Sequence, residues 1–575
     1  MVRIRKIEIR NFRSIQSLDW TPAAGINCLV GPGDSGKSTI LDSIDLCLGA
    51  RRNVSFGDTD FFGLDVTQPV AISLTLGALP DGLKNLDTYG DFLRGFDATP
   101  GHVEDEPRAG IETVLTLRLT VASDLEPNWT LFSERAQGLG LERALSWKDR
   151  VALAPARIGS YANTNLSWTR SSVLNKLSEE RANLGAELAR AAREARANFG
   201  TQAAAQLAES LGIVTTTAMS LGVPVGATAQ ALLDSHSVSI SDGAIALHNE
   251  AGVPLRCLGT GSARLLVAGL QRAAAEAATI ALVDEVEYGL EPHRLVRLLD
   301  SLGAKDAALP LQVFMTTHSP VAIRELSGQQ VFVVRSSAAG HQVHNVGIAD
   351  DVQSTIRADP EAFLAKSIIV CEGASEVGFA RGLDQYWTSQ GQQSFLASGG
   401  AYVNVGGGDP DKCYARGTAL CRLGYRVMVL VDADKVPTQE SVDALRAAGG
   451  EDLTWRPGRA LEDELFLSLE DGAIDSLLQR ALEFVGEELV NANIQSQSNG
   501  AKTLNSVFGE GLTDGYTAET RALLGPASRK RNSGWYKSIT KFESIAKNIV
   551  GPNLGTADGA FVGLVEQLFR WTHAA

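Results

Sequence analysis

The sequence has little cysteine and lacks long apolar runs. Its six cysteines are scattered, without a CxxC pair, which argues against a zinc site or a disulfide framework and is typical of a reducing compartment. The N-terminal residues are basic and strand-like, without the apolar core of a signal peptide. No stretch reaches the roughly 18 unbroken apolar residues that a membrane-spanning helix needs. We therefore expect a cytoplasmic protein with no membrane partner.

Positive charge is also scarce. The formal net charge of −15 would repel nucleic acid if it were evenly spread. One stretch departs from this balance, because its five basic residues have no acidic residue between them: Arg529, Lys530, Arg531, Lys537 and Lys541. The negative total therefore does not exclude DNA as a partner.

Alternating strand and helix patterns predict an α/β fold. A chain of 575 residues is too long for one core, at roughly 100–200 residues per domain. Short apolar strands are predicted at residues 367–371, 401–405, 426–431 and 453–455, and the helical patterns between them imply a parallel sheet. Residues 172–212 are rich in Ala, Leu, Glu and Arg and are predicted to be helical, as is the region after residue 490.

A glycine-rich loop carries the first motif. The letters GPGDSGKST fit G-x-x-x-x-G-K-[ST], in which backbone N–H groups surround phosphate oxygens, the lysine reaches the terminal phosphates and the next hydroxyl faces Mg²⁺. A plain glycine turn is the alternative, but the flanking strand and helix patterns favour a phosphate loop. The predicted ATP-binding residues are Gly31, Gly33, Asp34, Ser35, Gly36, Lys37, Ser38 and Thr39, with Ser38 also on the Mg²⁺.

The stretch TIALVDEVEYGLEPHR supplies an acidic strand end for the same site. Asp284 is predicted to hold the Mg²⁺ through water, and Glu285 to orient or deprotonate the attacking water. A solvated acidic turn would be the better interpretation if the phosphate loop were absent. His318 ends a further strand, VFMTTH, where a lone histidine is more often structural, although the motif order suits a sensor of the γ-phosphate.

A second group of acidic residues lies almost four hundred residues further on. The letters VMVLVDADK place Asp432 and Asp434 on one face of an extended strand end, and SIIVCEGASEV places one acid at a strand end and another in the next helical turn. Helix capping or solvation explains any single pair, but three clusters in one α/β unit favour a site for Mg²⁺ or Mn²⁺. The predicted ligands are Glu372, Glu376, Asp432, Asp434, Glu462 and Glu464.

The order of the nucleotide motifs resembles the ABC-type ATPases of the SMC and Rad50 kind. In that family a signature loop follows a long insertion, and the signature of one protomer completes the nucleotide site of the other. LGTGSARLL is a degenerate match, with a glycine turn as the alternative. The resemblance implies that Gly261 and Ser262 contact the γ-phosphate in a homodimer or higher oligomer, and that the helical insertion serves dimerisation.

The pattern Glu-Gly at one strand end and Asp-x-Asp at another resembles the Toprim fold of topoisomerases, primases and OLD (overcoming lysogenization defect) nucleases. An ABC-type ATPase joined to a Toprim domain is the arrangement of the OLD family, and the metal motifs look like its class 2, with a layout similar to the Gabija antiphage nuclease. SGWYKSI resembles the family's late lysine motif, so Lys537 is the implied contact to the scissile phosphate or leaving group. A generic DNA-contacting lysine is an equal alternative.

The resemblance implies five regions. These are an ATPase in two parts (1–165 and 237–355), a helical dimerisation insertion (166–236), a Toprim nuclease domain (360–490) and a helical C-terminal region (491–575). The expected function is a DNA endonuclease with two Mg²⁺ or Mn²⁺ ions and a regulatory ATPase, acting in antiphage defence or DNA repair. The expected catalytic residues are Asp432, Asp434, Glu285 and Lys537. A UvrD-like helicase is an expected candidate partner. The alternative is an SMC-like or Rad50-like DNA-binding ATPase without nuclease activity; a topoisomerase or primase ranks low.

Overall fold

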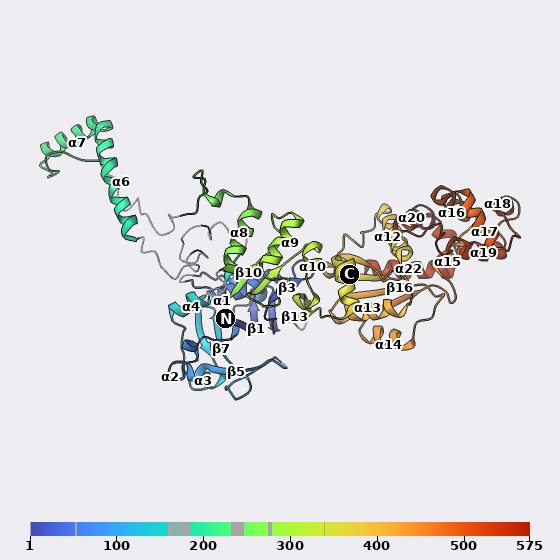
Figure 1. Cartoon of the computed structure of the whole chain (residues 1–575), viewed down its shortest axis with the longest axis horizontal. Coiled ribbons are helices and arrows are strands. Elements are labelled where there is room, and N and C mark those ends of the chain that lie inside the picture. The colour runs from blue at the N-terminus through green and yellow to red at the C-terminus, as the bar shows by residue number, and fades with distance from the viewer. Residues whose placement is uncertain are drawn as a thin grey trace. The chain divides into compact units, whose positions relative to one another are not determined.

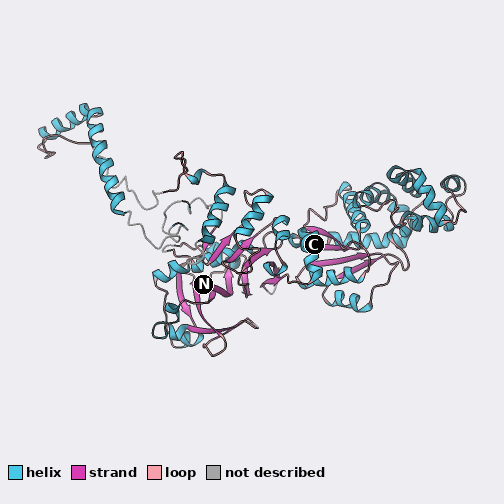
Figure 2. Cartoon of the chain, in the orientation of Figure 1, coloured by secondary structure: helices cyan, strands magenta, loops and turns pink. Residues whose placement is uncertain are grey.

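The computed structural model describes residues 2–51, 54–99, 101–158, 166, 174, 185–231, 246–273, 279–337 and 340–574. The chain folds into two compact units: Met1–Arg13, Thr21–Asn27 and Ser38–Thr316 form the first, and Ser14–Trp20, Cys28–Lys37 and Thr317–Ala575 form the second. Both units contain helices and strands (Figure 1, Figure 2), which agrees with the predicted α/β class. None of the described helices has the length and apolar character needed to cross a membrane.

The first unit contains an antiparallel sheet. Its strands are β1 (Arg3–Phe12), β4 (Val70–Gly77), β7 (Glu112–Val121), β5 (Leu93–Asp97) and β6 (His102–Glu104), hydrogen-bonded in that order, and β8 (Pro127–Phe132) pairs with β7. In β1 the side chains of Ile7 and Ile9 are fully buried, whereas Arg10 is exposed. This alternation is typical of a sheet with one face against a core.

Parallel strands in the same unit carry one of the acidic motifs. β10 (Ile280–Val283) pairs in parallel with β9 (Ala156–Arg157) and with β11 (Gln312–Thr316). Every residue of β10 and β11 is buried, as expected for parallel strands covered on both faces. The helices of this part of the chain are α1 (Lys37–Leu48), α2 (Leu86–Tyr89), α3 (Glu134–Gly138), α4 (Trp147–Leu153), α8 (Thr260–Ala273) and α9 (Pro292–Ser301).

The predicted helical insertion is described only in part. Helices α6 (Gly185–Gln206) and α7 (Ala208–Ser220) lie within it, while residues 167–173, 175–184 and 232–236 lie outside the described residues. On α7 and the loop after it, Ile213, Val214, Met219 and Leu221 are each more than half exposed. Exposed apolar side chains of this kind favour contact with another surface. The dimerisation role remains a prediction.

The second unit begins with strand pairs next to the phosphate loop. Residues Cys28–Val30 of β3 (Ile26–Val30) pair in parallel with β12 (Val331–Ser337), which pairs in antiparallel with β13 (Gly340–Asn345). Strand β2 (Ile15–Trp20) also belongs to this unit. Helices α10 (Pro320–Glu325) and α11 (Asp350–Ala358) then lead to a separate, four-stranded sheet.

The four-stranded sheet has parallel strands in the order β15 (Gly400–Asn404), β14 (Ser367–Cys371), β16 (Arg426–Val431) and β17 (Glu451–Thr454). The bounds of β14 and β16 are those predicted, and β15 and β17 start slightly earlier in the chain than expected. Because the strands are parallel, their carboxyl ends meet at one edge of the sheet, where such folds bind ligands. The helices around and after it are α12 (Ala374–Ser389), α13 (Asp411–Arg422), α14 (Gln439–Ala447), α15 (Leu461–Ser468), α16 (Asp471–Val485), α17 (Glu487–Gln497), α18 (Leu504–Thr513), α19 (Ala518–Ser528), α20 (Ile539–Ile545), α21 (Gly551–Asn553) and α22 (Gly559–His573).

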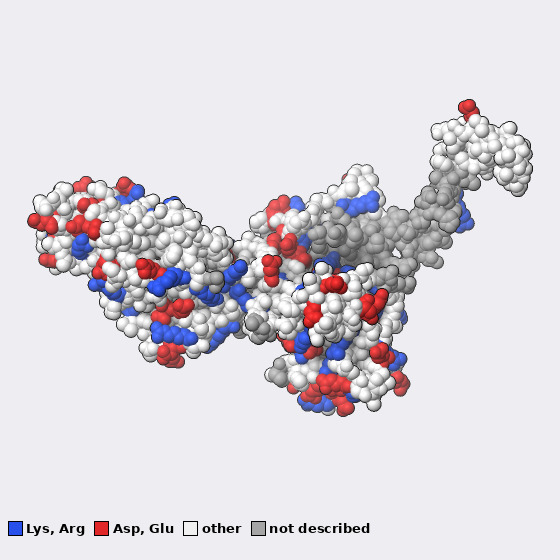
Figure 3. All heavy atoms as spheres, turned by 180° about the vertical axis from the view of Figure 1, so that it is seen from behind, with Lys and Arg blue, Asp and Glu red and all other residues white. Residues whose placement is uncertain are grey.

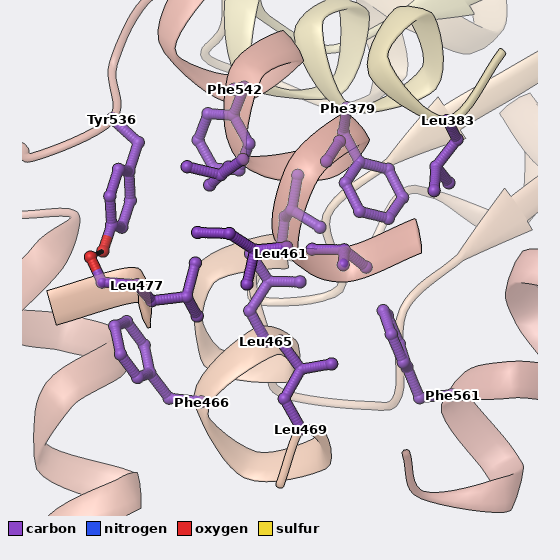
Figure 4. Packing of buried hydrophobic residues seen from close by; sticks show 14 of the residues in the cluster. Phe379, Leu383, Leu461, Leu465, Phe466, Leu469, Leu477, Tyr536, Phe542 and Phe561 are labelled. Atoms are coloured by element: carbon purple, nitrogen blue, oxygen red, sulfur yellow. Dashed lines mark hydrogen bonds between the residues drawn. The ribbon is translucent and has the colours of Figure 1, made fainter. Parts of the chain in front are cut away.

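A large apolar core joins this sheet to the C-terminal helices. Figure 4 shows Leu461 and Leu465 of α15 among aromatic side chains from other elements, including Phe379 of α12 and Phe542 of α20. Helices α12 and α20 approach closely because Gly378 has no side chain: a Cβ there would stand 2.5 Å from the carbonyl oxygen of Ile539. The core therefore fixes α12 and α15, whose first turns carry the predicted acidic ligands.

Candidate functional site

The phosphate loop lies between β3 and α1, as its mechanism requires. Gly31 has a φ of +140°, and a Cβ on it would stand 2.7 Å from the carbonyl oxygen of Val334, so only glycine fits there. Lys37 Nζ donates hydrogen bonds to the carbonyl oxygens of Gly31 (3.1 Å) and Pro32 (2.7 Å) and to Ser35 Oγ (3.2 Å). The lysine is therefore held inside the loop, where a phosphate would meet it.

The acidic end of β10 is held by two hydroxyl groups. Ser38 Oγ donates to Asp284 Oδ1 at 3.1 Å, and Thr316 Oγ1 donates to the same oxygen at 2.6 Å. The Glu285 N–H donates to Thr316 Oγ1 at 2.8 Å, and Glu285 has a φ of +46°, which is uncommon for a residue other than glycine. Ser38 and Asp284 are thus close enough to share one Mg²⁺. Thr316 positions this pair, and no sequence motif pointed to it.

Helix α8 is fastened to the turn that follows Asp284. The buried Arg264 guanidinium donates to the carbonyl oxygens of Asp284 (3.1 Å), Glu285 (3.1 Å) and Tyr288 (2.6 Å). Arg264 lies in the quoted signature-like stretch, but its contacts could not be read from the letters. It ties the predicted signature helix to the predicted catalytic turn.

The remaining nucleotide residues lie close to these motifs in the chain. Gly261 and Ser262 are in the first turn of α8, where Ser262 Oγ accepts a hydrogen bond from Arg294 Nη1 at 3.2 Å. His318 is exposed and follows β11. Their roles across a dimer and as a phosphate sensor stay predictions.

The strand ends of the second unit bring acidic residues together. β14 and β16 are neighbours in register, so Glu372 and Asp432, which follow them, meet at the same edge. The Asp432 N–H donates to Glu372 Oε2 at 3.2 Å. Asp432 Oδ1 accepts from the N–H of Leu461 at 2.9 Å. This last bond joins the strand end to α15.

Two further carboxylates enter from helix starts. Glu376, in the first turn of α12, is 3% exposed, and Glu462, in the first turn of α15, is 4% exposed. Burial, together with the charges of Glu376, Glu462 and Glu372, raises the pKa of Asp432 well above its ordinary value. Burial and the charges of Glu462 and Glu372 raise the pKa of Glu376 to about 8. Four predicted ligands therefore lie close enough to repel one another.

Asp434 and Lys537 lie at the border of this acidic group. Asp434 Oδ2 is 3.2 Å from Arg529 Nη1, and Arg529 Nη2 is 3.2 Å from Asp463 Oδ2. Burial raises the pKa of Glu462, and the positive charges of Lys537 and Arg529 act against that rise. The structure therefore adds Arg529 and Asp463 to the predicted residues. The basic stretch was recognised in the sequence, but no pattern indicated which of its charges turns toward the acids.

Glu464 corrects one prediction, because an arginine holds it away from the other acids. It is fully buried, with Arg456 Nη2 2.6 Å and Arg459 Nη1 3.3 Å from its Oε2. Although burial raises the pKa of Glu464, its hydrogen bonds and charge contact with Arg456 lower it below its ordinary value. The physical reason is helix geometry: residues two apart lie about 200° apart around the axis, so Glu462 and Glu464 cannot face one site.

Replacing Glu464 with glutamine is expected to destabilise the folded chain by about 2–3 kcal/mol, because it leaves the Arg456 charge without its buried partner. Urea unfolding followed by tryptophan fluorescence measures this. Glu483→Gln is the matched control, since Glu483 pairs with Arg480 on the surface and is 61% exposed; its expected effect is below about 0.5 kcal/mol. Equal losses in the two variants would contradict the structural role given to Glu464.

The acidic group fits a hard divalent cation by its chemistry. Its donors are carboxylate oxygens, which Mg²⁺ and Mn²⁺ prefer. A bound cation would also reduce the electrostatic repulsion between these neighbouring carboxylates. Among the residues that the structure describes, no group of three or more His, Cys, Asp or Glu is arranged to hold a metal ion. The carboxylates instead face other partners, as Glu376 Oε2 does by accepting from the Gly373 N–H at 2.7 Å. A cation held by several of these carboxylates would therefore require side-chain rotation.

The negative net charge does not form one acidic field on the face of the molecule that Figure 3 shows. On the face seen in Figure 3, Lys and Arg side chains alternate with Asp and Glu side chains on both units. Charge at a site is therefore set by local groups, which is the condition under which an acidic protein can still bind nucleic acid.

Together, the phosphate loop, its lysine and the serine–aspartate pair define a P-loop ATPase domain. The chain belongs to the family described as "AAA domain, putative AbiEii toxin, Type IV TA system", whose model matches residues 26–324, just over half of the chain. This match covers the phosphate loop, the acidic strand end and His318, and it ends before the four-stranded sheet.

Shorter stretches of the chain are similar in sequence to proteins that act on DNA or chromosomes. The chain is 30% identical over 109 residues to the OLD nuclease of Thermus scotoductus, covering 18% of this chain and 20% of that protein. It is 39% identical over 64 residues to the chromosome partition protein Smc of Methanocaldococcus jannaschii, covering 11% of this chain and 6% of that protein. Among solved structures, an Smc head bound to the C-winged helix domain of ScpA matches with 15% identity and a TM-score of 0.34, covering 59% of this chain and 96% of that chain. The matched parts span a fifth or less of these two curated relatives.

Proposed function

We propose that this protein is a metal-dependent DNA endonuclease of the Toprim type, controlled by its ATPase domain. The observation that carries the proposal is the meeting of Glu372, Glu376, Asp432 and Glu462 at one sheet edge, where the charges of Glu372 and Glu462 raise the pKa of both Asp432 and Glu376. A structural role does not account for so many acids in one place, two of them buried, because burying uncompensated carboxylates opposes folding. The local identity to an OLD nuclease supports the same proposal.

In this proposal, five carboxylates hold two Mg²⁺ or Mn²⁺ ions: Glu372, Glu376, Asp432, Asp434 and Glu462. When bound, a pair of such ions activates water and stabilises the leaving 3′ oxygen of a phosphodiester. Lys537 acts on Glu462 electrostatically, which supports the proposal that its charge contacts the scissile phosphate. ATP gates cleavage rather than powers it, since phosphodiester hydrolysis needs no energy input.

The wider assignment follows from the same resemblance. We infer a class 2 OLD-type enzyme, with a nuclease domain near residues 360–490, a helical region after it, and a role in antiphage defence or DNA repair. The exposed apolar side chains of α7 support a homodimer or higher oligomer through the insertion. A UvrD-like helicase is a candidate partner.

A second function has an observation in its favour. Because no described group of side chains is arranged as a metal site and part of the chain matches an Smc protein, the chain can instead be an SMC-like DNA-binding ATPase without nuclease activity. The two functions differ in whether phosphodiester bonds are broken.

A plasmid cleavage assay tests the proposal. Supercoiled plasmid is incubated with the purified chain and Mn²⁺ or Mg²⁺, once without nucleotide and once with ATP. We expect metal-dependent conversion to nicked or linear DNA, which agarose gels resolve, and none in EDTA. ATP hydrolysis with plasmid binding but no cleavage under any metal condition would overturn the nuclease proposal and favour the alternative.

A further inference from the structure

Arg529 forms ion pairs with Asp434 and with Asp463, and it thereby bridges two elements of the acidic site. It follows α19 directly, with one guanidinium nitrogen on Asp434 beyond β16 and the other on Asp463 of α15. An arginine can pair with two carboxylates at once because its donors are fixed in a planar fork.

The segment that carries Arg529 is firmly held. The Trp535 N–H donates to the Ser528 carbonyl oxygen at 2.8 Å, and Asn493 Nδ2 donates to the Ser533 carbonyl oxygen at 2.8 Å. Trp535 and Tyr536 are fully buried, and Tyr536 Oη donates to the Leu477 carbonyl oxygen at 2.8 Å (Figure 4). The guanidinium is therefore presented to Asp434 from a rigid base rather than from a free loop.

Asp434 thus differs from its neighbours in the site. Asp432 and Glu376 accept hydrogen bonds from the backbone N–H groups of Leu461 and Gly373; such donors stabilise a carboxylate but carry no full positive charge. Asp434 already has a full positive charge beside it. A divalent cation that needs Asp434 must compete with this charge, whereas one that needs only Asp432 and Glu376 does not.

We propose that Arg529 is an internal counter-cation that makes the two ion positions unequal. It holds Asp434 until a second divalent ion displaces it, so one ion binds tightly and the other weakly. This inference rests on the proposed metal site and names the residue that regulates its filling. Arg529 is a positioning residue, since it acts through Asp434.

Counting bound Mn²⁺ on the nucleotide-free full-length chain tests this inference. Electron paramagnetic resonance of free Mn²⁺ during a titration gives two dissociation constants for the wild type. In Arg529→Gln, the weaker ion is expected to bind about tenfold more tightly, equivalent to about 1.4 kcal/mol, while the tighter ion changes less than about twofold. Arg529→Lys keeps the charge but cannot span both carboxylates, and its weaker constant is expected to lie in between.

Arg531→Gln is the matched control, because Arg531 is exposed in the same segment and the variant removes the same charge. Its two constants are expected to stay within about twofold of the wild type. The inference is overturned if Arg529→Gln matches Arg531→Gln, if both ions tighten equally, or if the weaker ion binds less well. If Arg529→Gln does not fold by circular dichroism, Arg529→Lys decides by the same criterion. A wild type that binds no Mn²⁺ overturns the metal site of the proposed function as well.

Discussion

Replacing Asp432 with alanine is expected to lower metal-dependent DNA cleavage by about 10³-fold, while ATP hydrolysis stays within about twofold of the wild type. Asp432 is the carboxylate most affected by its neighbours, since Glu376, Glu462 and Glu372 all raise its pKa. A cation shared by these groups loses its central ligand in the variant, and metal stabilisation of a transition state amounts to several kcal/mol. Initial rates of plasmid nicking in Mn²⁺, beside phosphate release from ATP, measure both quantities.

Loss of cleavage by unfolding can be separated from loss of the ligand. Asp432→Ala removes a charge that its acidic neighbours oppose, so its thermal midpoint is expected to stay within a few degrees of the wild type. Asp443→Ala is the control, because Asp443 is an exposed residue of α14 in the same unit, and it should cleave normally. Retention of more than a tenth of the wild-type cleavage rate by Asp432→Ala would contradict its role as a shared ligand.

Lys37→Ala is expected to have the reverse effect. ATP hydrolysis should fall by about 10²–10³-fold, because the ammonium group held by the loop carbonyls is predicted to reach the terminal phosphates and to stabilise their developing charge. Cleavage without nucleotide should be unchanged. Steady-state phosphate release and nucleotide-free plasmid nicking give the two values.

Lys84→Ala provides the control for Lys37→Ala, since Lys84 lies on the surface beside Asp81. It should leave both activities intact. A Lys37 variant that hydrolyses ATP normally would contradict the assignment of the phosphate loop. Lys37→Ala and Asp432→Ala together distinguish an enzyme with two separate active centres from an SMC-like ATPase. An SMC-like ATPase does not cleave DNA, so neither variant could lower its cleavage rate.

The strands were predictable because their signals are local. Apolar runs such as SIIVC and RVMVLV end in acidic residues, and β14 and β16 have the predicted bounds. The meeting of Glu372 and Asp432 followed from parallel pairing alone. The phosphate loop was equally predictable from the sequence, since the ligand fixes the spacing of its residues.

Predictions failed where helix phase or tertiary contact decides the outcome. ALEDELF offers three acids, and only packing of α15 shows that Glu462 faces the site while Glu464 meets Arg456. Likewise, Arg529, Lys530 and Arg531 are adjacent basic letters, but only the anchoring of Trp535 and the end of α19 direct the first of them to Asp434. Arg264 and Thr316 act through backbone or hydroxyl contacts that leave no motif.

The buried anchors of Trp535 and Tyr536 have a consequence for how the enzyme is made. The acidic group starts with Glu372, whereas Arg529 and Lys537 leave the ribosome more than 150 residues later. Synthesis at roughly 5–20 residues per second separates them by on the order of ten seconds. On the proposed function, a nascent chain exposes its nucleotide-binding parts early, and its cutting centre gains the two basic groups that border it only after residue 537 has emerged.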